Sequence, residues 1–136
     1  MIAVHVYVEV TTMEQGIAFY CDGLGLTVKQ RFTPRWIELT GANAPIFLLA
    51  NLPLTADLGD TTHTRDYRRH WTPVHLDFIV SDLDGMLARL QALGGRLDRP
   101  VKQRDYGRIA NMADPFGNGF DLIEFSGSGY DAMPHV

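Results

Sequence analysis

The chain has little of several features that would narrow its function at once. It holds a single cysteine, Cys21, so no disulfide forms within the chain, which is typical of proteins in a reducing cytoplasm. No apolar run approaches the roughly 20 residues of a membrane-spanning helix, and the first ten residues lack the basic start of a signal peptide. A formal net charge of −4 provides no basic excess for nucleic acid or anionic lipid. We therefore expect a cytoplasmic protein that binds neither a membrane nor a nucleic acid.

The residues that are present form a repeat. The segments "AVHVYVEVTTMEQGIAFYCDGLG" and "TPVHLDFIVSDLDGMLARLQALGG" each combine strand-like alternation, capping residues, a helical apolar stripe and closing glycines. In the first segment the alternation runs from Ile2 to Val10. His5 and His75 hold the same position in the two copies. Two histidines at equivalent points of a repeated unit suggest a shared purpose.

Three strand-like runs follow each predicted helix. They are "LTVKQRF", "RWIELTG" and "PIFLLAN" in the first half, and "RLDRPVKQ", "GRIANMA" and "GFDLIEF" in the second. The stretch "DPFGN" predicts a hairpin turn between the last two runs. The sequence therefore predicts an α+β fold with βαβββ modules at 1–51 and 73–126, a linker or lid at 52–72, and a tail at 127–136.

Strand alternation places the two histidines on a common open face, because each helix must cover the other face of its own sheet. The same alternation in "GFDLIEF" adds Asp121 to this face. Two imidazoles and a carboxylate suit a divalent first-row metal, and three protein ligands leave coordination positions for substrate or water. The alternative is that the histidines are hydrogen-bonded strand residues and the aspartate is unrelated. The expected face carries His5, Tyr7, Glu9, His75, Asp77 and Asp121.

Three stretches together resemble the vicinal oxygen chelate superfamily: "VHVYVEV…GIAFYCDGLGL", "VHLDFIVSDLDGMLARLQALGG" and "MADPFGNGFDLIEF". This superfamily includes glyoxalase I, extradiol dioxygenases, fosfomycin-inactivating thiol transferases and bleomycin resistance proteins. The resemblance covers nearly the whole chain. It implies paired βαβββ modules whose eight strands form a mixed-sheet funnel around a metal site, and a homodimer in many members.

The family's metal positions fall on His5, His75 and Asp121. In glyoxalase I a fourth ligand is a glutamate, and its position here holds Phe47, whose ring cannot ligate a hard cation. Asp121 stands where a glutamate is usual and is one methylene shorter. The resemblance thus implies one divalent metal per site, either iron, manganese, nickel or zinc. The ligand set is similar to those of the dioxygenase and fosfomycin-transferase branches.

Further side chains are candidates for the site. Tyr7, Glu9 and Asp77 are candidate general acids or bases, or hydrogen-bond partners that orient the histidines. Glu38 is also a candidate substitute for the missing fourth ligand. Arg104 and Arg108 would bind an anionic substrate, or are simply solvated. The basic run "RDYRRHW", 65–71, either attracts an anion or lies in a surface or dimer contact. The candidate substrate-binding residues are Phe47, Glu38, Arg104, Tyr106 and Arg108.

Two functions remain open on the sequence. The first is a metal-dependent dioxygenase, lyase or thiol transferase that acts on a small molecule chelated through adjacent oxygens. The second is a metal-free small-molecule binding protein that resembles the bleomycin resistance proteins, which keep the funnel without its metal ligands. Metal content is the property that separates them.

Overall fold

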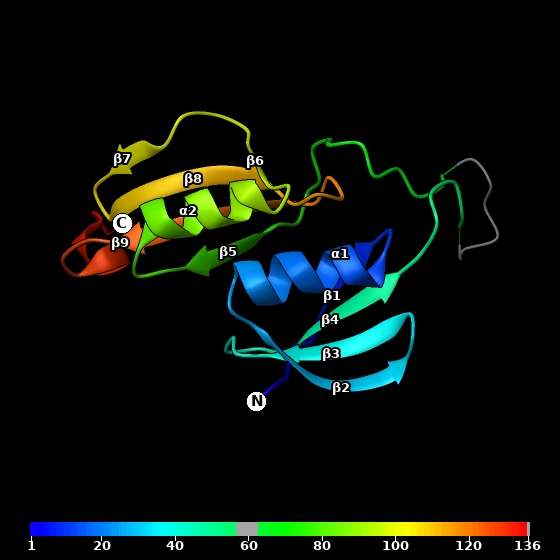
Figure 1. Cartoon of the computed structure of the whole chain (residues 1–136). Helices are drawn as coiled ribbons and strands as arrows, with labels where there is room; N and C mark the ends of the chain where they lie inside the picture. The colour runs from blue at the N-terminus through cyan, green and yellow to red at the C-terminus, as the bar shows by residue number, and fades with distance from the viewer. Residues whose placement is uncertain (57–62, 136) are drawn as a thin grey trace. The chain divides into compact units, whose positions relative to one another are not determined.

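The computed structural model describes residues 1–56 and 63–135 of the chain. It contains two compact units, Met1–Arg68 and Arg69–Val136, each with its own β-sheet and its own main helix (Figure 1). The order β-α-β-β-β occurs in both units, with one strand of the second unit divided in two. The predicted α+β class and paired modules are confirmed. The predicted linker or lid includes residues 57–62, which lie outside the described residues.

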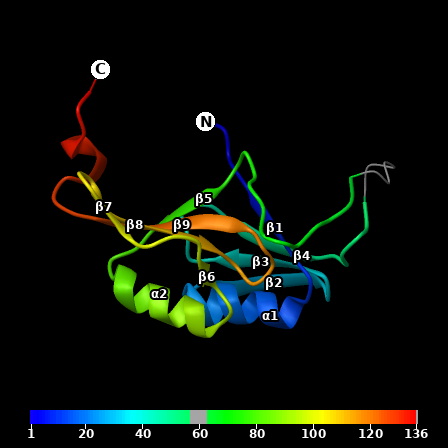
Figure 2. The same ribbon diagram turned by 90° about the horizontal axis from the view of Figure 1, so that it is seen from above.

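The first unit is a four-stranded sheet with a helix on one face (Figure 2). Its strands lie in the order β1-β4-β3-β2, with β1 parallel to β4 and the other neighbours antiparallel. The helix continues from α-helical into π-helical geometry, and Gly25 then turns the chain with a φ of 84°. The elements are β1 (Val6–Val10), α1 (Met13–Ile17), η1 (Ala18–Gly23), β2 (Thr27–Thr33), β3 (Trp36–Thr40) and β4 (Ile46–Ala50).

Alternation along the strands explains the core of the first unit. Val8 and Val10 of β1 are buried on the helix side, together with Leu48 of β4. Gly16 of α1 allows the helix to approach this layer closely, because a Cβ there would lie only 3.2 Å from side-chain atoms of Leu48 and Val10. The valine face of β1 is thus the face covered by the helix, as the alternation predicts.

Two details of the first unit differ from the sequence prediction. The alternation predicts a strand from Ile2, but β1 begins at Val6. Its pairing with β4 starts there, and Ile2 and Val4 are exposed. The threonines before the helix predict a side-chain cap, but Thr12 at the N-cap makes no such hydrogen bond. The apolar alternation therefore predicted a longer strand than the pairing of β1 with β4 supports.

The second unit repeats the plan with five strands. The order is β5-β9-β8-β6, β7 pairs with β8, and β5 is parallel to β9. The run "RLDRPVKQ" predicts one strand but forms two, β6 and β7, because Pro100 between them has no N–H to donate. No helix among the described residues has both the length and the apolar character to cross a bilayer. The elements are β5 (Leu76–Ile79), α2 (Leu83–Ala92), β6 (Arg96–Leu97), β7 (Lys102–Arg104), β8 (Gly107–Ala113), β9 (Gly119–Phe125) and η2 (Gly129–Ala132).

The predicted hairpin at 114–118 is confirmed and joins β8 to β9. Asp114 is buried at its start, and its carboxylate accepts hydrogen bonds from the backbone N–H groups of Phe116 (2.8 Å) and Asn118 (2.9 Å). The Asn118 side-chain amide donates to the other carboxylate oxygen at 2.9 Å. Gly117 supplies the positive φ, 80°, that closes the turn. This rigid turn fixes the register of β9 and therefore the position of Asp121.

Candidate metal centre

Three potential metal ligands meet on one face of the second unit. His75 directly precedes β5, Asp77 lies on β5, and Asp121 is the register partner of Asp77 on the parallel strand β9. One ligand atom from each residue lies within 4.8 Å of the other two. His75 Nε2 is 3.1 Å from Asp77 Oδ1 and 3.5 Å from Asp121 Oδ2. Proximity along the chain places His75 beside Asp77, and the parallel pairing of β5 with β9 brings Asp121 to them.

Asn111 on β8 extends the same row of side chains. It pairs in register with Asp121, and its Nδ2 donates to Asp121 Oδ1 at 2.7 Å. The other carboxylate oxygen, Oδ2, remains on the side of His75. A hydrogen bond of this kind fixes the orientation of a ligating carboxylate. The sequence analysis missed Asn111, although alternation in "GRIANMA" paired against β9 would have placed it here.

Charge is unbalanced in this cluster. Burial raises the pKa of Asp77, and the neighbouring Asp121 carboxylate raises it further, while His75 acts in the opposite direction. The pKa of the Tyr130 phenol is also raised, by burial first and then by Asp77, Tyr106 and Asp121. Because two carboxylates here share one imidazole, a cation or a proton between them relieves their repulsion.

The residues of the cluster fit a divalent metal ion. One imidazole nitrogen and two carboxylate oxygens are donors that zinc, iron and manganese accept in proteins. They already converge without rearrangement of the strands. Only three of the usual four to six ligand positions are supplied, so a bound ion would keep open positions for substrate oxygens.

His5 belongs to the first unit, where it lies just before β1. Its ring centroid is 5.2 Å from that of Phe47, and Tyr7 stacks on Phe47 at 4.8 Å with an interplanar angle of 9°. Phe47 is therefore an aromatic packing partner at the point where glyoxalase I is expected to hold its glutamate. The joining of His5 with His75 and Asp121 stays a prediction, because the positions of the two units relative to one another are not determined.

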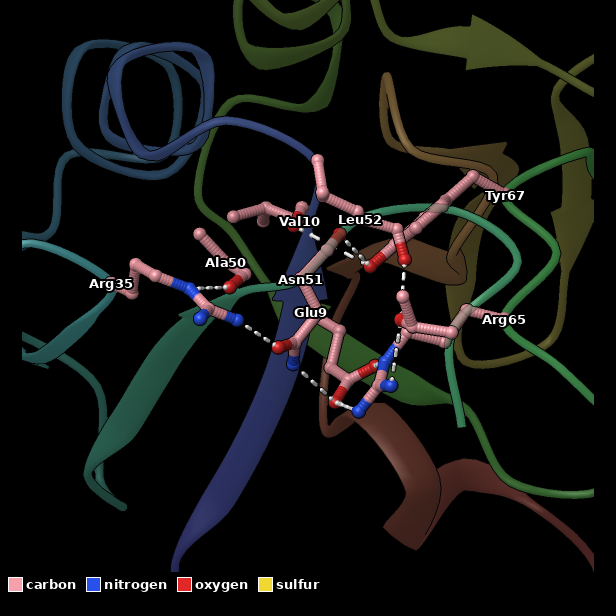
Figure 3. A network of polar contacts seen from close by, with 9 residues as sticks. Glu9, Val10, Arg35, Ala50, Asn51, Leu52, Arg65 and Tyr67 are labelled. Carbon is pink, nitrogen blue, oxygen red and sulfur yellow. Dashed lines mark hydrogen bonds and ion pairs between the residues drawn. The ribbon is translucent and has the colours of Figure 1, made fainter. Parts of the chain in front are cut away.

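The two glutamates of the first unit that are candidate site residues, Glu9 and Glu38, are already engaged by cations. Arg65 donates to Glu9 from Nε at 2.6 Å and from Nη2 at 3.0 Å, and Asn51 donates from Nδ2 at 3.0 Å, as Figure 3 shows. Glu38 is buried and accepts from Gln30 at 2.6 Å and from Lys29 at 3.1 Å. The hydrogen bond from Gln30, followed by that from Lys29, lowers the pKa of Glu38. Acid–base or ligand roles for these residues stay predictions.

The candidate residues near β7 and β8 point in different directions. Arg108 shares the parity of Glu124 rather than of Asp121, and its guanidinium binds Asp84 (3.0 and 3.1 Å) and Glu124 (3.0 Å). It lies on the helix side of the sheet, and the structure does not bring it to the cluster. Arg104 is exposed on β7. Tyr106 packs edge-on against Phe125 and Tyr130.

A hollow of about 220 Å³ adjoins the cluster within the second unit and includes His75 and Asp121 in its lining. Arg69, Arg99 and Trp71 also line it. The sequence analysis noted only the basic run that contains Arg69. Nothing in the alternation pattern predicts where this aperiodic segment lies.

Comparison with known proteins identifies the family. The family model described as Glyoxalase-like domain matches residues 5–123. The anthracycline biosynthesis protein DnrV of Streptomyces peucetius is 32% identical over 130 residues, which cover 93% of this chain and 42% of that protein. The chain thus spans about two fifths of the length of the curated relatives it matches.

Solved structures agree with this assignment at the level of the fold. The fosfomycin resistance protein FosX from Listeria monocytogenes superposes with a TM-score of 0.69 at 19% identity, covering 93% of this chain and 96% of that one. Lactoylglutathione lyase from Agrobacterium tumefaciens gives 0.60 at 17% identity, covering 91% and 92%. The chain therefore belongs to the glyoxalase-like domain family, and its predicted membership of the vicinal oxygen chelate superfamily is confirmed.

Proposed function

We propose that this protein is a divalent-metal-dependent enzyme that acts on a small molecule chelated through adjacent oxygens. The observation that supports the proposal is the convergence of His75, Asp77 and Asp121 within 4.8 Å, with Asn111 bonded to Asp121. His75 and Asp121 are the two ligands common to this geometry and to the family resemblance. The third ligand would be His5, by resemblance, or Asp77, by proximity.

The chain's residues would divide the work of the site between holding the ion and handling protons. A bound divalent ion would supply Lewis-acid stabilisation of negative charge on substrate oxygens. Asn111 would keep the Asp121 carboxylate aligned. If His5 completes the ligand set, Asp77 would be free of the ion and would serve as the base that accepts a substrate proton. Dioxygenation, lyase chemistry or thiol transfer would then depend on which metal is bound.

Oligomeric state, location and substrate are also part of this proposal. We infer a homodimer, as the family resemblance implies for many members, and a cytoplasmic location, which the single cysteine favours. The likeness to a protein named for anthracycline biosynthesis favours a substrate from small-molecule biosynthesis. Because the chain covers only part of that relative, the relative's own activity is not carried over.

Metal content tests the proposal directly. Protein purified without a histidine tag is expected to bind about one equivalent of iron, manganese, nickel or zinc per chain. His75→Ala is expected to lose this ion while the circular dichroism spectrum is unchanged. His135→Ala, which removes an exposed histidine of the tail, is the matched control and is expected to bind normally. Less than about a tenth of an equivalent, with no uptake of added metal, would exclude the enzyme.

A metal-free binding protein is the second candidate function, and one observation favours it. Phe47, which the family resemblance places at the position of the fourth glyoxalase ligand, stacks with Tyr7, and Phe32 stacks on Trp36 with centroids 4.2 Å apart. Such an aromatic layer suits a planar molecule without any metal. Stoichiometric binding of a planar ligand by protein that takes up no metal would establish this function instead.

A further inference from the structure

The hollow beside the candidate metal cluster carries two arginines that the proposed chemistry does not use. It is lined by Arg69 and Arg99, by the exposed ring of Trp71, and by the potential ligands His75 and Asp121. Its volume of about 220 Å³ is below the roughly 300–1,000 Å³ of sites for drug-sized molecules. A small molecule that touches the cluster would therefore also reach the arginines.

Arg69 is held in place rather than free in solvent. Its Nε donates to Asp98 Oδ2 at 3.1 Å, and its Nη1 donates to the backbone oxygen of His70. The side chain is only 26% exposed. Its Nη2 makes no hydrogen bond to any residue that the structure describes, so this donor remains available to a ligand. A guanidinium fixed on one side loses little freedom when it binds an anion on the other.

Gly119 provides the space in which the Arg69 guanidinium lies. A Cβ at position 119 would sit 2.5 Å from Arg69 Nη2 and 2.7 Å from its Cζ, which is closer than side chains approach. Gly119 is the first residue of β9, two positions before Asp121. Because Gly119 has no side chain, the Arg69 guanidinium has room to lie against β9, the strand that carries the candidate ligand Asp121.

The hollow is lined by two arginines, Arg69 and Arg99, and by two aspartates, Asp98 and Asp121, and the two arginines differ in how they are paired. Asp98 balances Arg69, whereas Arg99 has no ion pair or hydrogen bond among residues 1–56 and 63–135. Guanidinium groups bind carboxylates through paired N–H donors. The indole of Trp71, which is 81% exposed, offers a face for a flat ring.

We propose that this hollow is an anion-binding subsite, in which Arg69 and Arg99 bind the carboxylate of a small aromatic acid whose vicinal oxygens reach the His75–Asp121 cluster. The assignment of this acid as the substrate rests on the proposed metal-dependent function. The anion subsite itself requires no metal.

Binding of matched probes to the full chain tests the subsite. For metal-free protein the probes are benzoate and its neutral isostere benzamide. For metal-loaded protein they are 3,4-dihydroxybenzoate and catechol. In an NMR titration each acid is expected to bind at least about tenfold more tightly than its neutral partner. Arg69→Gln and Arg99→Gln are each expected to reduce this preference, and the double variant to abolish it. Arg96→Gln removes an exposed arginine of β6 outside the hollow and is expected to keep it.

Gly119→Ala provides a variant with no change of charge. Its methyl group is expected to displace the Arg69 guanidinium from its position against β9, so that the preference falls as it does in Arg69→Gln while metal uptake persists. An equal affinity for acid and neutral probe in the unaltered chain would overturn the subsite. So would a preference that survives in the double variant. Loss of metal binding with the benzoate preference intact would instead overturn the proposed enzyme and leave the subsite standing.

Discussion

At the scale of single residues, the acidic side chains differ in what balances their charge. Glu9 is paired with Arg65, and Glu38 with Lys29. Asp77 and Asp121 lie together, and His75 is the one cationic partner of both among the residues that the structure describes. A protein rarely keeps two carboxylates this close unless a proton or a cation joins them. This contrast is the physical reason for preferring Asp77 and Asp121 over the two glutamates as metal ligands.

Asn111 is expected to act on metal affinity through Asp121. Asn111→Ala removes the 2.7 Å hydrogen bond to Asp121 Oδ1 and allows the carboxylate to rotate. Loss of such a partner typically weakens metal binding by about 10- to 100-fold. Competition against a chromophoric chelator measures this change. Asn43→Ala, an exposed amide between β3 and β4, is the control and should bind metal as the unaltered chain does. Equal affinities for the two variants would show that Asp121 needs no such support.

At the scale of elements, the sequence correctly predicted the features that depend on residues close together in the chain. Alternation with a period of two located the strands, and "DPFGN" located the β8–β9 hairpin. The pattern was less informative where a partner strand sets the boundary, as at the start of β1, or where a proline interrupts pairing, as at Pro100. Pairing across the sheet is non-local, so Asn111 was recognised only from the register. Arg69 lies in an aperiodic segment that carries no such signal.

The start of α2 is expected to make stability depend on pH. Glu124 accepts a hydrogen bond from the Leu83 N–H at 2.8 Å and binds Arg108. First the Leu83 N–H and then Arg108 lower the pKa of Glu124 from 4.5. A lowered pKa stabilises the folded state above the ordinary value, and this contribution disappears as the pH falls through the lowered value. Glu124→Gln should therefore reduce the thermal midpoint at pH 7 and match the unaltered chain in strong acid.

Thermal unfolding followed by circular dichroism between pH 7 and strong acid measures this difference. Asp105→Asn, which removes an exposed carboxylate in the turn between β7 and β8, is the control. Its thermal midpoint should differ from that of the unaltered chain by the same amount at every pH. A Glu124→Gln deficit that stays constant down to strong acid would mean that the side chain acts by packing rather than by charge.

At the scale of the whole molecule, the repeat raises the question of whether His5 has the same role as His75. Each unit has its own sheet and its own helix, and each carries a histidine at the same point of its first strand segment. The second unit supplies His75, Asp77 and Asp121 without help from the first. If the repeated histidine has the same purpose in both units, a metal bound at the proposed site would also depend on His5.

His5→Ala is therefore expected to weaken metal binding by at least about tenfold, because an imidazole ligand is lost from the ion's first coordination sphere. Equilibrium dialysis against zinc or manganese measures this, with His135→Ala as the control. Unchanged affinity in His5→Ala together with loss in Asp77→Ala would make Asp77 the third ligand instead.

Where His5 is required, mixing the His5→Ala and His75→Ala chains distinguishes two arrangements in a dimer. Sites shared between subunits recover about a quarter of the unaltered capacity, because half of the randomly mixed dimers regain one site of two. Sites formed within one chain recover none.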